Sequence, residues 1–340
     1  MNSRRKYRSW IVTLLALTLL LVACLVAGLC IGETRFSPAG VARALAAPPE
    51  EVTGQIMRQL RLPRVLLGAA VGGALSLAGV ILQGVFRNPL VEPYTLGISG
   101  GASVGVSLAI VLSLQAAWGG FTLPLAGFAG ALITVLLVYG LGLRRGGVRV
   151  EALLLTGVMI SFIASSLVML LMATAKSDDL HGIIFWIMGS LNETNTSLIR
   201  LVVITALAAL ALSYLYAPAL NAMRLGMEPA RQLGVNTGRG VKALFLLASL
   251  LAGVCVSVAG LIGFVGLIIP RLMHFCVGPD YRVLLPASFL GGASFLVLSD
   301  IVARVVISPL ELPIGVITGI IGGALFIVIT GTVKTGRESR

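Results

Sequence analysis

The chain has 340 residues, of which 57% are hydrophobic and only 11% are charged, and its mean hydropathy is +1.02. Soluble domains carry about a quarter of Asp, Glu, Lys and Arg, so the composition excludes an ordinary soluble protein and favours one that lies in a lipid bilayer. The net charge of +12 does not indicate nucleic-acid binding, because the basic residues are spread over short polar segments and form no single patch with aromatic residues.

Ten apolar segments follow one another along the chain, and a helix needs about 20 residues to cross the hydrocarbon core. They lie near residues 10–32, 65–86, 95–118, 120–143, 152–175, 198–217, 243–260, 261–270, 283–299 and 312–333. We therefore predict an all-α integral membrane protein with about ten transmembrane helices, in a single domain over residues 1–340. Between the seventh and eighth segments, Gly260 and Gly263 favour a tight turn.

The charged residues predict an orientation. With the N-terminus placed in the cytoplasm, 17 of the 25 basic residues fall on the inner side, as the positive-inside rule requires. Both termini are then cytoplasmic. The segment from Leu21 to Cys24 resembles a bacterial lipoprotein cleavage site, but the apolar run continues to Ile31, which favours an uncleaved first helix.

Two short sequences recur and indicate an internal repeat. Residues 76–81 resemble residues 257–262, and residues 100–103 resemble residues 291–294. We interpret these offsets as five helices, an odd number that reverses the direction through the membrane. They predict an inverted-topology repeat of helices 2–5 and 7–10, which is a mark of transporters. Chance is the alternative, because Gly, Ala and Leu are abundant.

Several residue patterns are missing from the sequence. No Asp, Glu, Lys, Arg or His falls in the middle of a predicted span, which disfavours a proton- or sodium-coupled carrier. There is no phosphate-binding loop, no catalytic constellation and no metal-ligand spacing among the four cysteines and two histidines. We expect a transport subunit that is not an enzyme, binds no cofactor or metal and takes its energy from another subunit. A self-sufficient carrier or channel and a membrane enzyme are the alternatives.

Eight stretches, in this order along the chain, carry a resemblance to a known family. They are residues 59–64 (QLRLPR), 87–93 (RNPLVEP), 96–102 (LGISGGA), 185–191 (FWIMGSL), 230–235 (ARQLGV), 263–270 (GFVGLIIP), 300–304 (DIVAR) and 311–315 (ELPIG). Together they resemble the permease subunits of the ABC importers for ferric siderophores, haem and cobalamin. The chain departs from that pattern at Arg271 and His274, where the family usually shows these two residue types in the reverse order, and at Tyr281, where His is common.

The resemblance implies a type II importer in the bacterial cytoplasmic (inner) membrane. It implies a homodimer, two ABC ATPase subunits on the cytoplasmic side that hold the ATP and Mg²⁺, and a periplasmic or extracellular substrate-binding protein. The cargo would be a large metal chelate, most often a ferric siderophore, with cobalamin and haem as alternatives.

The resemblance also implies that Arg61, Arg64 and Arg304 dock the binding protein by forming salt bridges with its glutamates. Arginine suits this role, because its planar fork grips a carboxylate with two hydrogen bonds. Pro63 favours a helix start between the first two. The alternatives are contact with lipid headgroups and, for Arg304, a local ion pair with Asp300 one helical turn earlier.

A short polar segment resembles the coupling helix that docks into the ATPase. Pro229 favours a helix start and Gly234 a helix end, and Ala230 and Leu233 would offer an apolar contact. The predicted coupling residues are Gly226, Glu228, Pro229, Ala230, Arg231, Gln232, Leu233 and Gly234. A solvated basic loop is the alternative.

Two further sites are predicted around the fifth span. The turn at Arg149, Val150 and Glu151 precedes it, where similar permeases narrow the pathway into a cytoplasmic gate. Four residues on the span could line the pathway, although membrane serines more often bond a backbone carbonyl of their own helix. They are Met159, Ser161, Ser165 and Ser166.

Overall fold

The computed structural model describes residues 3–32, 34–48, 51–115, 119–144, 147–148, 150–308 and 310–338. Over these residues it contains seven helices that are long and apolar enough to cross a membrane, and three shorter apolar helices. These ten helices fall on the ten apolar segments of the sequence, so the predicted all-helical membrane fold is confirmed.

The ten apolar helices are α1 (Ser3–Cys30), α4 (Leu62–Phe86), α5 (Ile98–Val111), α7 (Thr122–Gly142), α8 (Val150–Thr174), α10 (Thr196–Leu215), α13 (Thr237–Ala259), α14 (Val265–Val277), α15 (Tyr281–Val305) and α16 (Ile314–Glu338). The connecting elements are α2 (Pro38–Ala46), α3 (Val52–Gln55), the π-helix η1 (Ile56–Arg61), the 3₁₀ turns η2 (Pro93–Leu96) and η3 (Gly119–Phe121), the strands β1 (Leu143–Arg144) and β2 (Gly147–Val148), α9 (Ser177–Met188), α11 (Ala217–Met223) and α12 (Met227–Gln232). β1 and β2 pair antiparallel.

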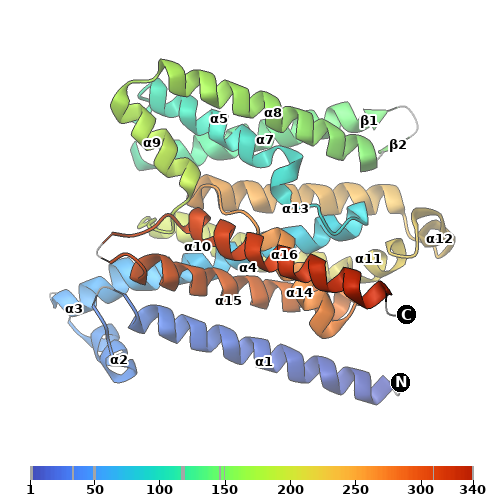
Figure 1. Ribbon diagram of the computed structural model, residues 1–340, viewed down its shortest axis with the longest axis horizontal. Helices are drawn as coiled ribbons and strands as arrows, with labels where there is room; N and C mark the ends of the chain where they lie inside the picture. The colour runs from blue at the N-terminus through green and yellow to red at the C-terminus, as the bar shows by residue number, and fades with distance from the viewer. Residues whose placement is uncertain are drawn as a thin grey trace.

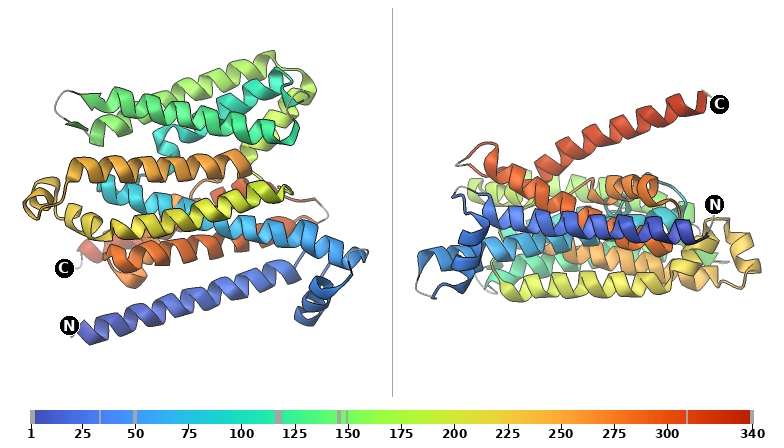
Figure 2. Two further views of the ribbon diagram at one scale, coloured as in Figure 1. Left: turned by 180° about the vertical axis from the view of Figure 1, so that it is seen from behind. Right: turned by 90° about the horizontal axis from the view of Figure 1, so that it is seen from below.

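The helices form an elongated bundle whose two ends differ (Figure 1). Both termini, α12 and the β1–β2 turn lie at one end, which we call the α12 end. At the opposite end, which we call the α2 end, lie α2 and α3. α5, α7 and α8 pack into one group, and α13 connects that group to the rest of the bundle (Figures 1 and 2). The charge distribution predicts that the α12 end is cytoplasmic.

α4 is the central helix of the bundle. In its most apolar 18-residue stretch 89% of the residues are buried, against 11% in α1. Glycines allow this packing, because a Cβ at Gly72 would overlap the carbonyl oxygen of Gly292 on α15, and a Cβ at Gly79 would overlap that of Gly266 on α14. Small residues let membrane helices approach this closely. The apolar outer faces of α1 and α8 suit contact with lipid.

The two halves of the chain share a sequence of elements. In each half a long helix (α4 or α13) is followed by an irregular segment with a left-handed residue, Gly97 at φ 82° or Phe264 at φ 68°. Next comes a short helix, α5 with 14 residues or α14 with 13. α4 packs on α14 and α15, and α13 packs on α5 and α7. Each long helix therefore packs on helices of the other half, as an inverted repeat of helices 2–5 and 7–10 requires.

Two details of the sequence interpretation need correction. Residues 76–81 and 257–262 lie on or directly after α4 and α13, five spans apart, but residues 100–103 and 291–294 lie on α5 and α15, which are six spans apart. The second match therefore does not relate equivalent helices. Pro63 is in the first turn of α4, as predicted, but helical backbone already precedes α4 from Val52 through η1, so the helix is longer than the predicted span.

The first helix runs without a break from Ser3 to Cys30. Cys24 is buried on it against Val65 and Val297, where it acts as a small apolar side chain. The expected break after the seventh span is present, because α13 ends at Ala259 and Gly260 follows at φ 67°.

Candidate functional site

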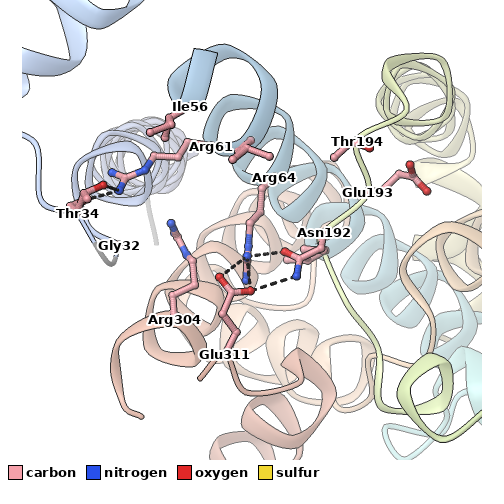
Figure 3. A pocket seen from close by; sticks show the side chains of 12 residues that line it. Gly32, Thr34, Ile56, Arg61, Arg64, Asn192, Glu193, Thr194, Arg304 and Glu311 are labelled. Atoms are coloured by element: carbon pink, nitrogen blue, oxygen red, sulfur yellow. Dashed lines mark hydrogen bonds and ion pairs between the residues drawn. The ribbon is translucent and has the colours of Figure 1, made fainter. Parts of the chain in front are cut away.

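A cavity of about 410 Å³ lies at the α2 end. Figure 3 shows the side chains that surround it, with Arg61 and Arg64 on the continuous helix formed by η1 and α4 and Arg304 on α15. The structure thus brings together the three arginines that the sequence predicted as a group. It adds Asn192 and Glu311, which the sequence interpretation did not include.

Arg64 connects three parts of the chain. Its Nε donates to Asp300 Oδ1 on α15 over 2.8 Å, and its Nη1 lies 2.8 Å from Glu311 Oε2 in the segment before α16. Its Nη1 also donates to Asn192 Oδ1, and Asn192 Nδ2 donates to Glu311 Oε2 over 3.1 Å. Arg64 has 13% of its side chain exposed and Asp300 only 2%, so this network is largely buried and joins α4, α15 and the segment before α16.

Arg61 and Arg304 both bind the C-terminus of α1. Arg61 Nη1 donates to the carbonyl of Leu29 over 2.8 Å, and Arg304 donates to the carbonyls of Ile31 (3.0 Å) and Gly28 (3.2 Å). The last carbonyls of a helix have no partner within the helix and carry partial negative charge. The last turn of α1 has no basic residue of its own, so the two arginines satisfy these carbonyls.

The docking role of the three arginines stays a prediction, and the structure limits how it could operate. Arg61 is 7% exposed and Arg304 is 5% exposed. Arg304 Nε lies 3.0 Å from Asp300 Oδ2, which is the local ion pair weighed as the alternative, although that oxygen accepts no hydrogen bond. A carboxylate of the binding protein would reach Arg64 through the cavity, but Arg64 is already paired with Glu311.

Glu311 is the second carboxylate of this site, and it lies in the segment that connects α15 to α16. Burial raises the pKa of Glu311, but the hydrogen bonds from Arg64 and Asn192 outweigh it, so the pKa lies below its usual value of 4.5. The side chain is ionised at neutral pH and is 36% exposed. It is therefore the member of the network that an incoming group could displace.

The predicted coupling segment forms the short helix α12 at the α12 end of the bundle (Figure 1). Gly226 before it adopts φ 128°, and Gly234 after it adopts φ 83°, so both glycines stand where the backbone needs them. Glu228 and Arg231 pair over 2.6 Å on its surface. Pro229 lies in its first turns and Gln232 is its last residue.

Of the two apolar side chains that were predicted to contact a partner, only that of Leu233 is exposed. Leu233 is 66% exposed, but Ala230 is fully buried against the protein itself. Ala230 therefore anchors α12 to the bundle and is not available to a partner. Leu233 is the apolar side chain of the pair that this segment presents to solvent.

The predicted gate falls partly outside the described residues. Arg149 is not among them, and of Val150 only the backbone is described, as the start of α8. Glu151 is exposed in the first turn of α8. No contact in the described part of the chain assigns these residues a gating role, which stays a prediction.

The predicted pathway residues lie on α8. Met159, Ser165 and Ser166 are exposed on the surface of the single subunit, and Ser161 is half-buried. The hydroxyls of Ser161 and Ser166 donate to backbone carbonyls four residues earlier, as the alternative predicted. The exposed face is open to a second subunit or to lipid.

Sequence reasoning missed a polar junction inside the bundle. The segment after α4 was placed in an inner loop, yet it carries Glu92 and Tyr94 to the start of α14. Glu92 accepts a hydrogen bond from the backbone N–H of Phe264, and the Tyr94 hydroxyl accepts one from Ile262 over 3.2 Å. Gln83 on α4 donates to the carbonyls of Gly266 and Leu267.

This junction explains how irregular backbone is accommodated within the bundle. Peptide groups in a bilayer need partners from the protein, and the break between α13 and α14 frees several of them. The side chains come from the first half of the repeat and their partners from the second. The sequence did contain one signal of this junction. Glu92 lies in the 87–93 stretch, and a carboxylate in so apolar a chain needs a hydrogen-bond donor.

Comparison with known proteins agrees with this architecture. The chain is 42% identical over 276 residues to the uncharacterized ABC transporter permease protein YvrB of Bacillus subtilis, covering 81% of this chain and 78% of the relative. It is 38% identical to the vitamin B12 import system permease protein BtuC of Klebsiella pneumoniae, covering 95% of this chain and 94% of the relative. It is also 38% identical to the hemin transport system permease protein HmuU of Yersinia pestis, covering 80% and 82%.

The fold has a solved counterpart as well. A metal-chelate type ABC transporter in an inward-facing conformation superposes with a TM-score of 0.82 at 33% identity, covering 94% of this chain and 99% of that one. The profile of the FecCD transport family matches residues 19–331. The protein therefore belongs to the FecCD transport family.

Proposed function

We propose that this protein is the permease subunit of an ATP-driven importer that carries a metal chelate across the cytoplasmic membrane of a bacterium. The observation that carries the proposal is that the chain matches vitamin B12 and hemin permeases over most of both lengths. It has no phosphate-binding loop, so ATP and Mg²⁺ would be bound by separate ATPase subunits. Alternating access of the helix bundle would move the cargo inward.

The coupling proposal rests on α12. This helix lies at the end that holds both termini, which the charge distribution predicts to be cytoplasmic, and it offers the exposed side chain of Leu233. An apolar side chain on a short rigid helix suits a groove of a soluble partner. Motion of the ATPase would pass to the bundle through the buried contact of Ala230.

The docking proposal rests on the cavity at the α2 end. A glutamate of a substrate-binding protein would compete with Glu311 for Arg64, since both carboxylates need the same guanidinium. Losing Glu311 would release the segment that leads into α16. In this way docking outside would affect a helix that runs to the α12 end.

The homodimer proposal rests on α16. A Cβ at Gly319 or Gly323 would meet no atom of the described residues within 4 Å, although glycines spaced by four residues favour close helix packing. Figure 2 shows α16 standing away from the bundle along most of its length. A second subunit would cover this face and enclose a pathway together with α8.

The cargo is proposed from its chemical class. Relatives at equal identity carry vitamin B12 and hemin by their names, so identity alone does not select between them, and a ferric siderophore is our first expectation. Among the described residues no group of His, Cys, Asp or Glu could hold a metal ion, which favours a binding protein that sets specificity and a permease that handles an intact chelate.

Uptake by cells tests the proposal. A strain that lacks the gene should fail to accumulate one of three labelled cargoes, namely a ferric siderophore, cobalamin or haem, and the restored gene should rescue it. Rescue that survives depletion of ATP with the proton gradient intact would favour the alternative of a self-sufficient carrier or channel. The absence of charged residues from the centres of the spans disfavours that alternative.

A further inference from the structure

A second cavity, of about 290 Å³, lies at the α12 end, between the last turn of α4, α14 and the turn into α15. Four basic side chains line it: Arg87 at the C-cap of α4, Arg224 after α11, and Arg271 and His274 on α14. No Asp or Glu is among the described residues that line it. The cavity therefore concentrates positive charge.

The nearest acidic neighbour is engaged elsewhere. Asp280 lies in the turn before α15, where its Oδ1 accepts hydrogen bonds from Asn221 Nδ2 (2.9 Å) and from the backbone N–H of Arg282 (3.1 Å). It caps the N-terminus of α15. Its carboxylate thus serves the backbone of the turn and is not among the groups that line the cavity.

Two donors in this cavity lack an acceptor from the protein. Tyr281 is only 6% exposed, its hydroxyl lies directly against Gly84, and the described part of the chain offers that hydroxyl no hydrogen-bond partner. The Arg271 guanidinium lies 5.2 Å from the centre of the Phe275 ring and donates no hydrogen bond to a described residue. Arg271 is half-buried, and an acceptor-rich ligand in the cavity would give both donors a partner.

The fold assembles this cavity from separate parts of the chain. Arg271 and His274 lie on α14, Tyr281 lies at the start of α15, and all three line the cavity together with Arg224. Guanidinium groups and a phenol hydroxyl that converge on one cavity favour a ligand with several oxygen acceptors.

The position of the cavity identifies the source of the ligand. A neighbouring cavity shares Arg224 and Pro279 with it and is lined by Trp10, whose ring packs edge-on against Tyr7. Trp and Tyr gather at the level of lipid headgroups. Phe275 is 55% exposed beside Arg271, which gives an apolar surface next to the basic one, as a lipid with a charged headgroup and an acyl chain requires.

We propose that this cavity binds the phosphate group of an anionic phospholipid at the α12 end of the membrane. Arg224 and Arg271 grip the phosphate oxygens, because the guanidinium fork matches phosphate geometry, and the Tyr281 hydroxyl donates a further hydrogen bond. Basic pockets between membrane helices bind such headgroups. The bound lipid fixes α14 against α4 and against the turn into α15. This inference does not depend on the cargo or on an ATPase.

Lipid binding to the purified full-length protein tests the proposal. The protein in mild detergent is titrated with phosphatidylglycerol, with phosphatidylcholine and with inorganic phosphate, while native mass spectrometry counts bound lipid and the thermal unfolding midpoint is recorded. We expect one phosphatidylglycerol per chain at a concentration about tenfold lower than phosphatidylcholine. Arg224→Gln with Arg271→Gln should weaken it about tenfold or more, as charge-assisted hydrogen bonds require.

Two single substitutions test the proposal if the double substitution of Arg224 and Arg271 impairs folding. Tyr281→Phe removes only the hydroxyl and should weaken binding several-fold, and Arg271→Lys keeps the charge but not the fork. The matched control is Arg239→Gln with Lys242→Gln, which removes the same charge from exposed residues of α13 at the same end and should leave binding unchanged.

Three results would overturn the proposal. An equal loss in the control pair would mean diffuse attraction to the basic surface. Equal protection by inorganic phosphate would assign the cavity to a free anion in place of a lipid. Unchanged binding in both Tyr281→Phe and Arg271→Lys would place the headgroup outside the cavity.

Discussion

Arg64 and Asp300 form an ion pair, with 2.8 Å between Arg64 Nε and Asp300 Oδ1, although 236 residues separate them in the sequence. The pair joins α4 to α15, and these helices belong to different halves of the inverted repeat. Both side chains are largely removed from water. The contact between the two halves of the repeat at the α2 end therefore depends on this buried ion pair.

Removal of Asp300 should be strongly destabilising. Asp300→Ala leaves Arg64 and Arg304 without the carboxylate that lies between them, and breaking a buried ion pair from one side costs about 3–5 kcal/mol. The free energy of unfolding, measured by denaturation of the purified protein from detergent into SDS, should fall by about that amount. Glu311→Ala is the control, because Glu311 is partly exposed and should cost about 1 kcal/mol or less. Equal losses would contradict the structure.

Glu311 should make the protein sensitive to acid. Its pKa is lowered in the folded state, so the stability it contributes is complete above the usual carboxyl value of 4.5 and is lost as the pH falls through the folded pKa. At pH 7 the unfolding midpoint of Glu311→Gln should lie below that of the unaltered protein. The difference should shrink as the pH falls below 4.5. A difference that stays constant down to pH 3 would mean that folding does not lower the pKa of Glu311.

Leu233 should be needed for coupling and not for folding. Leu233→Asp places a charge on the exposed apolar side chain of α12, so ATP-driven uptake should be lost while the unfolding midpoint stays unchanged. Leu225→Asp is the matched control, since Leu225 is 64% exposed and Leu233, the C-cap of α12, is 66% exposed, but Leu225 lies before Gly226 and outside the predicted coupling segment. Unimpaired uptake by Leu233→Asp would remove α12 from the coupling proposal.

The open glycines of α16 should control dimer formation. A Cβ at Gly319 would meet no atom of the described residues within 4 Å. The Gly319→Leu subunit should therefore fold normally, but the added side chain should hold a second helix away and shift the population towards monomer in native mass spectrometry. Gly140→Leu on α7 is the control, because its Cβ also meets nothing and no dimer contact is proposed there. A Gly319→Leu protein that dimerises as before would place the interface on another face.

The ten spans could be predicted from the sequence because the bilayer imposes both their length and their apolar character. The same reasoning identified the break at Gly260 and the helix between Gly226 and Gly234, since glycine marks these turns. These features depend on residues that are local in the sequence or on the direction of each span. The grouping of Arg61, Arg64 and Arg304 came from the resemblance to known permeases.

The partners of the predicted residues could not be read from the sequence. Arg61 and Arg304 bind carbonyls of α1 that lie about 30 and more than 270 residues away, and no periodicity records such a contact. Ala230 was expected to offer an apolar contact to a partner, but it packs inward. Glu92 falls between two predicted spans in the sequence, whereas the structure gives it a partner in the backbone N–H of Phe264 within the bundle.

The central claim is that this chain transports only together with ATPase subunits. The most direct measurement is to purify the tagged protein from its native membranes in mild detergent and to identify stoichiometric partners by mass spectrometry. We expect an ABC-type ATPase at one copy per permease chain. A preparation that is active in uptake after reconstitution and repeatedly contains no ATPase would contradict the account.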